Sequence, residues 1–455
     1  MSFASINPAT GETIATFATM TDREIVSALA SADACFHTDW KRRPVAERSA
    51  VMARAAALLR QKREEYAGYT VAEMGQPFAQ ALYEVDLSAD ILDYYASNAA
   101  HFLAPREVPG SPGASVLTEP VGVILAIEPW NFPYYQLARV AGPQIVAGNV
   151  VMTKHAGNVP QCALAFARLF AEAGAPGGVY TNLFCTVDQI GTLIDDFRVR
   201  GVTLTGSERA GAAVAERAGR ALKKVVLELG GNDPMIVLGD ADLDMAVDMA
   251  VTGRTFNTGQ ACISTKRLIV VGAERGKQVL DTLITKFGDL VVGDPADEAT
   301  AIGPIVSEGA LEQLLDQVGR AKGAGATIVC GGRRIDRPGF YMEPTIITGI
   351  DEGNPLYREE AFGPVLSFYT VNTEEEAIRL ANDSPYGLGA ALIGADVDHA
   401  RAIADRIDAG MVFINSFAHS VAELPFGGVK NSGFGRELGE AGIGEFVNRK
   451  LIRVA

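Results

Sequence analysis

Cysteine is scarce in this chain: five occur among 455 residues, and no two stand at a spacing that suggests a pair. This excludes a disulfide framework and favours a reducing compartment, so we expect a cytoplasmic protein. Long apolar runs are absent as well. No stretch reaches the roughly 18 apolar residues that a membrane-spanning helix needs, and the N-terminus lacks a basic segment followed by an apolar run. We therefore expect no membrane partner and no secretion signal.

Positive charge is also in short supply. Lysine and arginine total 40 against 55 acidic residues, which gives a formal net charge of −15. Nucleic acids and anionic membrane surfaces bind basic patches, so neither is an expected partner, and an anionic small ligand would need a local cation. The two standard phosphate fingerprints, G-x-G-x-x-G and G-x-x-x-x-G-K-[ST], do not occur either.

What the chain does contain is enough apolar material for more than one domain. Its 48% hydrophobic and 21% charged residues describe a globular protein, and its length suggests two or three domains. The first hundred residues look mainly helical. A capping box at Thr21–Glu24 starts one helix, and Pro44 starts another that runs through an alanine-rich stretch to about Tyr66.

From Ser115 onward short β-branched runs alternate with helix-like segments, which is typical of βαβ units and parallel sheets. The predicted strands of the first block are 115–119, 121–127, 149–153, 179–184, 201–205 and 224–229, and those of the second are 235–238, 268–271, 327–330, 365–369 and 411–415. The tail, 446–454, alternates like an exposed edge strand that could pair with another chain. The predicted class is α/β, with two doubly wound-type domains of mostly parallel sheet and a small β arm.

Cys262 is the cysteine whose surroundings suggest a nucleophile. It follows the polar run Asn257-Thr258-Gly259-Gln260-Ala261, which supplies backbone amides, and a thiolate needs such a setting. A buried structural thiol is the alternative. The other four cysteines, Cys35, Cys162, Cys185 and Cys330, lie in apolar or small-residue contexts typical of packing.

Three further segments sit where strands end. The turn Gly206–Gly211 leads from a strand into a helix, which can form an anion site, although a plain tight turn is the alternative. Glu228 ends an apolar strand, where burial would raise its pKa towards that of a general base; a solvated or salt-bridged charge is the other interpretation. Asn131, between Pro129 and Pro133, is a rigid amide that could stabilise an oxyanion or merely cap a turn.

The order and spacing of these segments resemble the aldehyde dehydrogenase superfamily. The resemblance includes Glu359–Pro364 and runs from Asn7–Glu12 to Phe426–Gly433, nearly the whole chain. It implies a cofactor-binding domain at 1–113 and 122–229, a catalytic domain at 230–418, and an oligomerisation arm at 114–121 and 436–455. It also implies oxidation of an aldehyde: Cys262 attacks the carbonyl, Asn131 and the Cys262 N–H hold the oxyanion, and Glu228 activates water. No metal takes part.

By the same resemblance, a nicotinamide dinucleotide accepts the hydride. Its predicted contacts are Trp130, Lys154, Gly157, Gly206, Ser207, Leu229, Glu360 and Phe362. Relatives restricted to NAD usually carry glutamate where this chain has Gly157. A carboxylate there would repel a 2′-phosphate, and Lys154 could pair with one, so we predict that NADP is preferred and NAD is usable.

Within the superfamily the closest resemblance is to the shorter-chain bacterial succinate semialdehyde dehydrogenases. Arg139 stands eight residues after Asn131, where that group has an arginine for the distal carboxylate; a salt-bridged structural arginine is the alternative. A second arginine of some relatives is replaced by Phe256. Gln136, His419 and Ser420 are the neutral donors that could substitute. Succinate semialdehyde is thus the predicted substrate, with glutarate semialdehyde or a medium-chain aliphatic aldehyde as the alternative.

Two other classes of function stay open. A thiol hydrolase or esterase would use Cys262, Asn131 and Glu228 without a hydride acceptor. A catalytically silent binding protein on the same fold would show no turnover over a broad panel of aldehydes. For every one of these functions the exposed tail strand predicts a homodimer or homotetramer.

Overall fold

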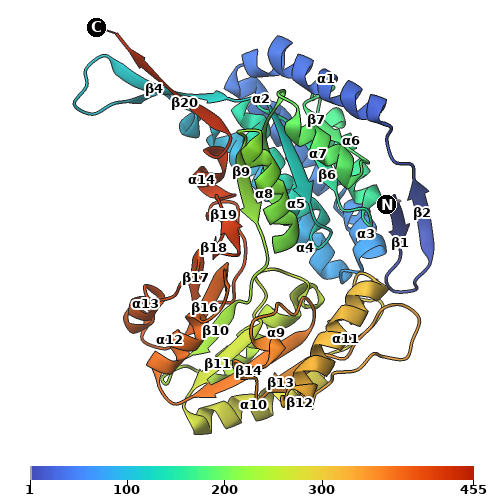
Figure 1. The fold of residues 1–455 in the computed structure, drawn as a ribbon, viewed down its shortest axis with the longest axis vertical. Coiled ribbons are helices and arrows are strands. Elements are labelled where there is room, and N and C mark those ends of the chain that lie inside the picture. Colours follow the sequence, from blue (N-terminus) through green and yellow to red (C-terminus); the bar gives the residue numbers. More distant parts are fainter. Residues whose placement is uncertain (1–2, 455) are drawn as a thin grey trace.

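The strand and helix alternation builds two mostly parallel sheets in the computed structural model, which describes residues 3–454. Figure 1 shows the sheets in separate halves of the molecule, with a narrow arm projecting from the upper half beside the C-terminus. The predicted class, α/β with two doubly wound-type domains and a small β arm, is confirmed. Among residues 3–454, no helix combines the length and the apolar character needed to cross a bilayer.

The upper sheet has the strand order β19-β9-β8-β5-β6-β7. Its strands are β5 (Val123–Glu128), β6 (Val150–His155), β7 (Tyr180–Asn182), β8 (Val199–Thr205), β9 (Lys224–Glu228) and the short antiparallel β19 (Gly433–Phe434). The chain runs outward from β5 to β7 and then crosses back to β8. Ligands of open α/β sheets bind where the strand order reverses in this way, at the carboxyl ends of the strands.

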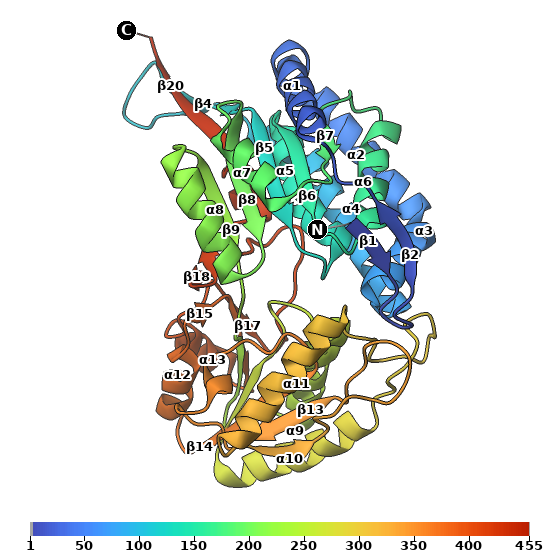
Figure 2. The same cartoon turned by 45° about the vertical axis from the view of Figure 1, so that its right-hand side comes forward.

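Helices cover both faces of this sheet, which explains its apolar strands. They are α1 (Asp22–Thr38), α2 (Val45–Gln61), α3 (Arg63–Met74), α4 (Phe78–Phe102), α5 (Pro133–Ala147), α6 (Pro160–Glu172), α7 (Val187–Asp195) and α8 (Glu208–Arg220). In Figure 2, α5 lies in the middle of the upper half, and α4 packs against α2, α3 and α5. Every residue of α5 is buried, so the positions of the side chains in its first turn are fixed by packing on all sides.

The lower sheet has the order β12-β13-β14-β11-β10-β16-β17. Its strands are β10 (Pro234–Val237), β11 (Arg267–Val271), β12 (Thr327–Cys330), β13 (Thr345–Thr348), β14 (Val365–Val371), β16 (Gly389–Ile393) and β17 (Met411–Ile414). Only β12 pairs antiparallel, with β13. Its helices are α9 (Leu243–Thr255), α10 (Ala273–Gly288), α11 (Glu308–Gly323), α12 (Glu374–Asn382) and α13 (Val397–Ala404).

Smaller elements complete the chain. They are the hairpin β1 (Phe3–Ile6) and β2 (Thr13–Phe17), the pair β15 (Tyr386–Gly387) and β18 (Val429–Lys430), the helix α14 (Gly439–Ile443), and the turns η1 (Trp40–Arg42), η2 (Phe256–Gly259) and η3 (Pro355–Tyr357). The arm is a three-stranded sheet of β20 (Val447–Arg453), β4 (Ala114–Pro120) and β3 (Arg106–Glu107), in that order. Strand β3 therefore belongs to the arm, although the predicted ranges placed it in the first domain.

The N-terminal region agrees with the sequence only in part. The capping box is confirmed, because the Thr21 hydroxyl accepts from the Glu24 N–H and the Glu24 carboxylate accepts from the Thr21 N–H. Pro44 precedes α2 as its N-cap, as expected for a helix start. The helix ends at Gln61 rather than near Tyr66, because Lys62 leaves helical geometry at φ −104° and ψ 23°. The hairpin β1–β2 was not predicted.

Candidate active site

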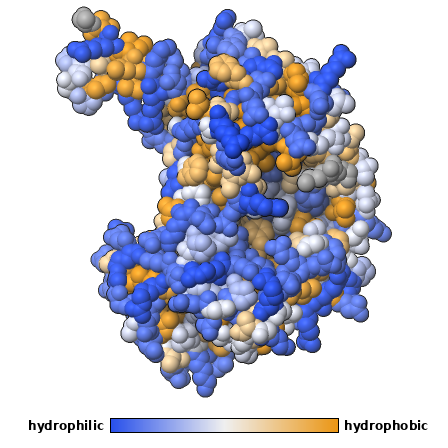
Figure 3. Space-filling model, in the orientation of Figure 1, coloured by the Kyte–Doolittle hydropathy of each residue, from blue (hydrophilic) through white to orange (hydrophobic). Residues whose placement is uncertain are grey.

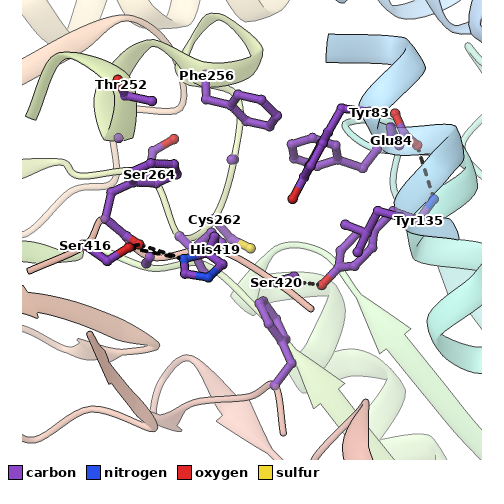
Figure 4. A pocket seen from close by; sticks show the side chains of 18 of the residues that line it. Tyr83, Glu84, Tyr135, Thr252, Phe256, Cys262, Ser264, Ser416, His419 and Ser420 are labelled. Atoms are coloured by element: carbon purple, nitrogen blue, oxygen red, sulfur yellow. Dashed lines mark hydrogen bonds between the residues drawn. The ribbon is translucent and has the colours of Figure 1, made fainter. Parts of the chain in front are cut away.

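A cavity of about 400 Å³ lies between the two halves, with Cys262 in its wall (Figure 4). Four segments line it: α4, the start of α5, the end of α9 with the loop to Ser264, and the chain between Ser416 and Phe426. Most of the lining side chains are apolar or aromatic, including Tyr83, Leu87, Phe132, Phe256 and Phe426. No lysine or arginine of residues 3–454 lines it. The cavity therefore suits an aliphatic chain.

The backbone before Cys262 turns sharply. Asn257 and Thr258 have φ values of 55° and 56°, a left-handed conformation that is uncommon outside glycine, and Gly259 continues it at 72°. A Cβ at Gly259 would collide with the carbonyl oxygen of Gly363, so only glycine fits this position. Strained turns of this kind persist when the surrounding structure holds them in place.

Long-range hydrogen bonds supply that support. The Asn257 N–H donates to Gln80 Oε1 on α4 at 2.6 Å, and Asn257 Nδ2 donates to the carbonyl of Asn131 at 2.7 Å. From the other side, the fully buried Arg254 donates to the carbonyl of Gly259 at 2.8 Å. The loop that carries Cys262 is thus tied to both halves of the molecule.

Cys262 is half-buried in the cavity wall. Burial raises the pKa of its thiol to about 12, and the charges of Lys266 and Arg139 partly oppose this rise. The thiol is therefore protonated in this arrangement, and it becomes a nucleophile only when a base or added positive charge removes its proton.

Lys266 supports the Cys262 loop, and nothing in its sequence context signals this role. The side chain is almost fully buried; Nζ donates to the carbonyl oxygens of Ala261, at 2.8 Å, and Cys262. Nζ also pairs with Glu360 Oε1 at 3.1 Å. This lysine fixes the two peptide groups that flank the Cα of Cys262, and the first of them contains the Cys262 N–H.

Asn131 is buried between β5 and α5, beside the same loop. Its Nδ2 donates to the carbonyl of Gln260 at 3.2 Å, and its Oδ1 accepts from Gln136 Nε2 at 3.2 Å. The second bond sets the orientation of the amide, with its N–H end towards the chain leading to Cys262. A fixed amide donor next to a nucleophile is the arrangement that stabilises an oxyanion.

Glu228 ends β9 and is buried, and neither carboxyl oxygen has a hydrogen-bond partner within residues 3–454. Burial, and next the charge of Glu437, raise its pKa well above the usual range. Glu228 does not line the cavity that holds Cys262. To act as a base towards water at Cys262, its side chain has to turn out of this position.

Arg139, predicted to bind the substrate carboxylate, is not brought to the cavity. It is fully buried; Nε lies 2.6 Å from Glu437 Oε2, and one terminal nitrogen donates to Thr205 Oγ1 at 3.0 Å. The other terminal nitrogen donates to the Tyr135 hydroxyl at 3.3 Å, and the guanidinium lies over the Phe426 ring. A direct contact with substrate does not fit this arrangement, because these partners already occupy the guanidinium.

Arg139 is the cation of a buried acidic cluster. Glu128, Glu228 and Glu437 are all buried around it, and burial with mutual repulsion raises the pKa of Glu128 and Glu228 well above the usual range. Glu437 also accepts from the Thr203 hydroxyl at 3.2 Å. The charges of Arg139 and Arg436 only partly offset burial and repulsion, so the protonated forms of Glu128 and Glu228 are favoured. Of these three carboxyl groups, the sequence analysis had identified only Glu228 as a candidate site residue.

Gln136, His419 and Ser420 do line the cavity. The His419 Nδ1 lies 3.0 Å from the carbonyl of Phe417, so in the neutral ring Nδ1 carries the proton and Nε2 is an acceptor. The Ser420 hydroxyl is 2.6 Å from the Tyr135 hydroxyl, as the dashed line in Figure 4 marks. Their predicted contacts with substrate are therefore possible in this geometry.

The turn before α8 has the form of an anion site. Ser207 is the N-cap of α8 and its hydroxyl accepts from the backbone of the first turn, while the Gly206 N–H donates to the carbonyl of Glu228 at 2.9 Å. Leu229 packs so closely on Gly211 that a Cβ there would lie 2.7 Å from its side chain. The free N–H groups at the start of the helix can bind phosphate oxygens.

Lys154 lies near the end of β6, which β5 separates from β8, and Gly157 follows two residues after that strand. Lys154 is largely buried, which lowers its pKa, and its ammonium has no ion-pair partner within residues 3–454. Gly157 uses its carbonyl to accept from the Ala4 N–H at 3.0 Å, and it carries no side chain. An unpaired cation beside a position without a carboxylate fits a 2′-phosphate group.

The remaining predicted coenzyme residues join the two halves. Trp130 meets Phe362 edge to face, with ring centroids 5.7 Å apart. Glu360 accepts from the Gly231 N–H at 3.1 Å in addition to its pair with Lys266. Its carboxylate is held in place and can serve as a fixed acceptor for a ribose hydroxyl.

Comparison with known proteins agrees with this arrangement. A model of the aldehyde dehydrogenase family matches residues 1–452. A protein of Deinococcus radiodurans named succinate-semialdehyde dehydrogenase [NADP(+)] is 50% identical over 452 residues, which cover 99% of this chain and 94% of that protein.

Solved structures show the same similarity in three dimensions. A structure of Gox0499 superposes with a TM-score of 0.99, at 50% identity and with both chains fully covered. The succinic semialdehyde dehydrogenase of Streptococcus pyogenes, solved with NADP⁺, superposes with a TM-score of 0.98 at 45% identity over 99% of each chain. This chain therefore belongs to the aldehyde dehydrogenase family and is an oxidoreductase.

Proposed function

We propose that this enzyme oxidises succinate semialdehyde to succinate, with NADP⁺ as the preferred hydride acceptor and NAD⁺ as a second one. The observation that carries the proposal is the half-buried thiol of Cys262 in the wall of a cavity, on a loop to which the fixed amide of Asn131 donates at Gln260. The names of the relatives support the choice of substrate and coenzyme.

In the first step the Cys262 thiol passes its proton to solvent water, and its sulfur bonds to the carbonyl carbon of the aldehyde. The carbonyl oxygen becomes an oxyanion, which Asn131 Nδ2 and the Cys262 N–H stabilise. When the oxyanion re-forms its C=O bond, the hydride on that carbon leaves and a thioester on Cys262 remains. The bound dinucleotide supplies the hydride acceptor, so it must share the pocket.

In the second step Glu228, ionised once its side chain has left the buried position, takes a proton from a water molecule, and that water attacks the thioester carbon. The carbon–sulfur bond breaks, the carboxylic acid leaves, and the sulfur is free for another cycle. A buried carboxyl with a raised pKa can hold the proton and later release it. The geometry requires the Glu228 side chain to turn towards Cys262 for this step, because its resting position lies outside the cavity.

The coenzyme preference rests on Lys154 and Gly157. Lys154 offers an unpaired cation for a 2′-phosphate, and Gly157 offers no carboxylate to repel it. Ser207 and the N-terminus of α8 receive the pyrophosphate. Glu360, held by Lys266, accepts from the nicotinamide ribose.

The distal carboxylate of the substrate meets neutral donors. Gln136 and Ser420 line the cavity and can donate to it, and His419 lines the cavity beside them. Arg139 lies behind this wall, where it donates to the Tyr135 hydroxyl, and takes no part in binding the carboxylate. The resulting recognition is weaker than a bidentate arginine would give.

Steady-state kinetics over two-carbon to six-carbon aldehydes, with and without a terminal carboxylate and with each coenzyme, tests the proposal. We expect kcat/KM for succinate semialdehyde with NADP⁺ to exceed that for butanal by about tenfold or more. Ser420→Ala is expected to lower this ratio while leaving butanal oxidation nearly unchanged. Equal values for the two aldehydes in the parent enzyme would reject the carboxylate assignment, and a kcat/KM strongly favouring NAD⁺ would reject the coenzyme assignment.

A second candidate substrate class is glutarate semialdehyde or a medium-chain aliphatic aldehyde. The aromatic side chains of Tyr83, Phe132 and Phe256 and the absence of lysine and arginine from the described lining favour it. The same panel distinguishes the candidates, because kcat/KM would then rise with chain length whether or not the aldehyde carries a carboxylate.

A further inference from the structure

The first turn of α5 carries much of the active site, yet it has no cap of its own. Its N-cap residue, Phe132, has no side-chain acceptor, and Pro133 at the first helical position has no N–H. The first free donors are the N–H groups of Tyr134 and Tyr135, which an N-cap serine or aspartate would ordinarily receive. Because α5 is fully buried, water cannot easily take that place.

Glu84, on the neighbouring helix α4, fills this role. Its Oε1 accepts from the Tyr134 N–H at 2.7 Å and from the Tyr135 N–H at 3.1 Å. Figure 4 shows the Glu84 carboxyl reaching across to the start of α5 at the edge of the cavity. The side chain is buried, and its other oxygen, Oε2, has no partner within residues 3–454.

The capped turn leads directly to the oxyanion donor. Gln136, next after Tyr135, donates from Nε2 to Asn131 Oδ1 and thereby sets which end of the Asn131 amide faces the Cys262 loop. Tyr135 also places its hydroxyl on Ser420. A displacement of this turn would therefore move the amide donor.

We propose that Glu84 is a positioning residue for the reaction: by capping α5 from a neighbouring helix, it holds Gln136 and, through Gln136, the oxyanion donor Asn131 in register with Cys262. The inference depends on the proposed acyl-transfer chemistry at Cys262, but not on the identity of the aldehyde or of the coenzyme.

Protonation of Glu84 leaves this role intact. Burial raises its pKa to about 8, while the two backbone N–H groups lower it. A carboxylic acid keeps a carbonyl oxygen that accepts both hydrogen bonds, as does the amide of glutamine. What the role requires is the acceptor oxygen, and the negative charge is secondary.

This distinction defines a matched pair of variants, Glu84→Gln and Glu84→Met. Both preserve the length of the side chain, but only glutamine keeps the acceptor. We expect E84Q to retain kcat within about threefold, and E84M to lose about tenfold or more in kcat with a smaller change in KM, because a misplaced oxyanion donor acts on the transition state.

Glu73 provides a structural control. It caps α6 in the same way, accepting from the Gln161 N–H at 2.9 Å and the Cys162 N–H at 3.0 Å, behind a proline at the first helical position. The first turn of α6 does not line the cavity. We expect Glu73→Met to lower Tm as Glu84→Met does, and to keep kcat within about twofold at saturating coenzyme.

Two measurements separate positioning from mere stability. The first is hydrolysis of p-nitrophenyl acetate, which acylates Cys262 and needs the oxyanion donor but no coenzyme; E84M should be impaired here too, and E73M should not. The second is a double-mutant cycle with Asn131→Ala. In that background E84M should lower kcat by less than about twofold further, since its effect passes through Asn131.

The proposal is overturned if folded E84M keeps the parent kcat in both assays. It is also overturned if the losses of kcat caused by E84M and N131A multiply in the double variant. If E84M fails to fold, the comparison moves to Glu84→Asp, which shortens the reach but keeps the charge; E84D at the parent kcat would equally overturn the proposal. If the parent enzyme hydrolyses the ester but does not oxidise succinate semialdehyde, the proposed substrate is wrong, and the inference about Glu84 is unaffected.

Discussion

At the scale of single residues, the chemistry begins from an unreactive thiol. Burial raises the pKa of Cys262 to about 12, so very little thiolate is present at neutral pH in the ligand-free protein. The nearby charge of Lys266 lowers the pKa of Cys262 only in part, since the ammonium of Lys266 is already shared between two carbonyl groups and Glu360. The protein thus keeps its nucleophile protonated until a reaction complex forms.

This state predicts how the ligand-free enzyme reacts with iodoacetamide. Because only the thiolate is alkylated, we expect the rate at Cys262 to rise about tenfold per pH unit from about pH 7 to about pH 9, without a plateau. Peptide mass spectrometry at each pH measures it. The variant Cys262→Ser supplies the background from the other half-buried cysteine, Cys330. A plateau reached near neutral pH would contradict the raised pKa.

Arg139 leads to a prediction about stability. Its removal leaves Glu437 as a buried carboxylate without its cation, beside Glu128 and Glu228. We expect Arg139→Ala to lower the free energy of unfolding by about 3–5 kcal/mol, measured by urea denaturation. Arg139→Met combined with Glu437→Gln should recover part of this loss, because the unpaired charge of Glu437 is then removed.

The same variant tests the substrate contact. We expect Arg139→Ala to change KM for succinate semialdehyde and for butanal to a similar extent, within about threefold. A rise in KM confined to succinate semialdehyde would restore the direct contact with the carboxylate that the sequence had suggested.

At the scale of helices and strands, local sequence patterns predicted the longer buried strands and missed several short ones. Buried runs such as 123–128 and 199–205 are recognisable because both faces of a parallel sheet are covered. The short strands β13 and β16 were missed, since four or five residues such as Thr345–Thr348 carry too little periodicity. The hairpin β1–β2 was missed as well, because the first hundred residues were predicted to be helical.

The active-site residues also divide into those that the local sequence identifies and those that it does not. Cys262, Asn131 and Glu228 each stand in a local motif, so the sequence could identify them. Lys266 and Glu84 stand in no such motif, because their roles depend on partners that only folding brings close. Glu84, for example, accepts a hydrogen bond from the N–H of Tyr134, 50 residues later in the chain. The environment of Arg139 could not be predicted for the same reason, since it depends on Glu437 near the C-terminus.

The end of strand β6 allows a test of coenzyme preference. Gly157→Glu introduces a carboxylate next to Lys154, where it would accept from ribose hydroxyls and repel a 2′-phosphate. We expect the ratio of kcat/KM for NADP⁺ to that for NAD⁺ to fall by about a hundredfold. Lys154→Met should lower the same ratio without improving NAD⁺. An unchanged ratio in both variants would place the 2′-phosphate elsewhere.

At the scale of the whole molecule, the projecting arm is the part without internal support. Strand β20 pairs with β4 on one side only, and within residues 3–454 no strand covers its other edge. Leu451, Ile452 and Val454 are 64%, 41% and 71% exposed, and Figure 3 shows apolar side chains gathered on the arm. Exposed apolar edges of this kind favour pairing with another chain.

We therefore expect a homodimer or homotetramer held together in part by β20. In analytical ultracentrifugation the parent should sediment as a multiple of 48.1 kDa, and Leu451→Lys should shift it towards a smaller multiple, because a buried ammonium in the interface would be unpaired. Leu222→Lys is the matched control, since Leu222 is 94% exposed in the turn between α8 and β9 and is not part of the arm. A parent enzyme that sediments as a monomer at micromolar concentration would show that the arm has another role.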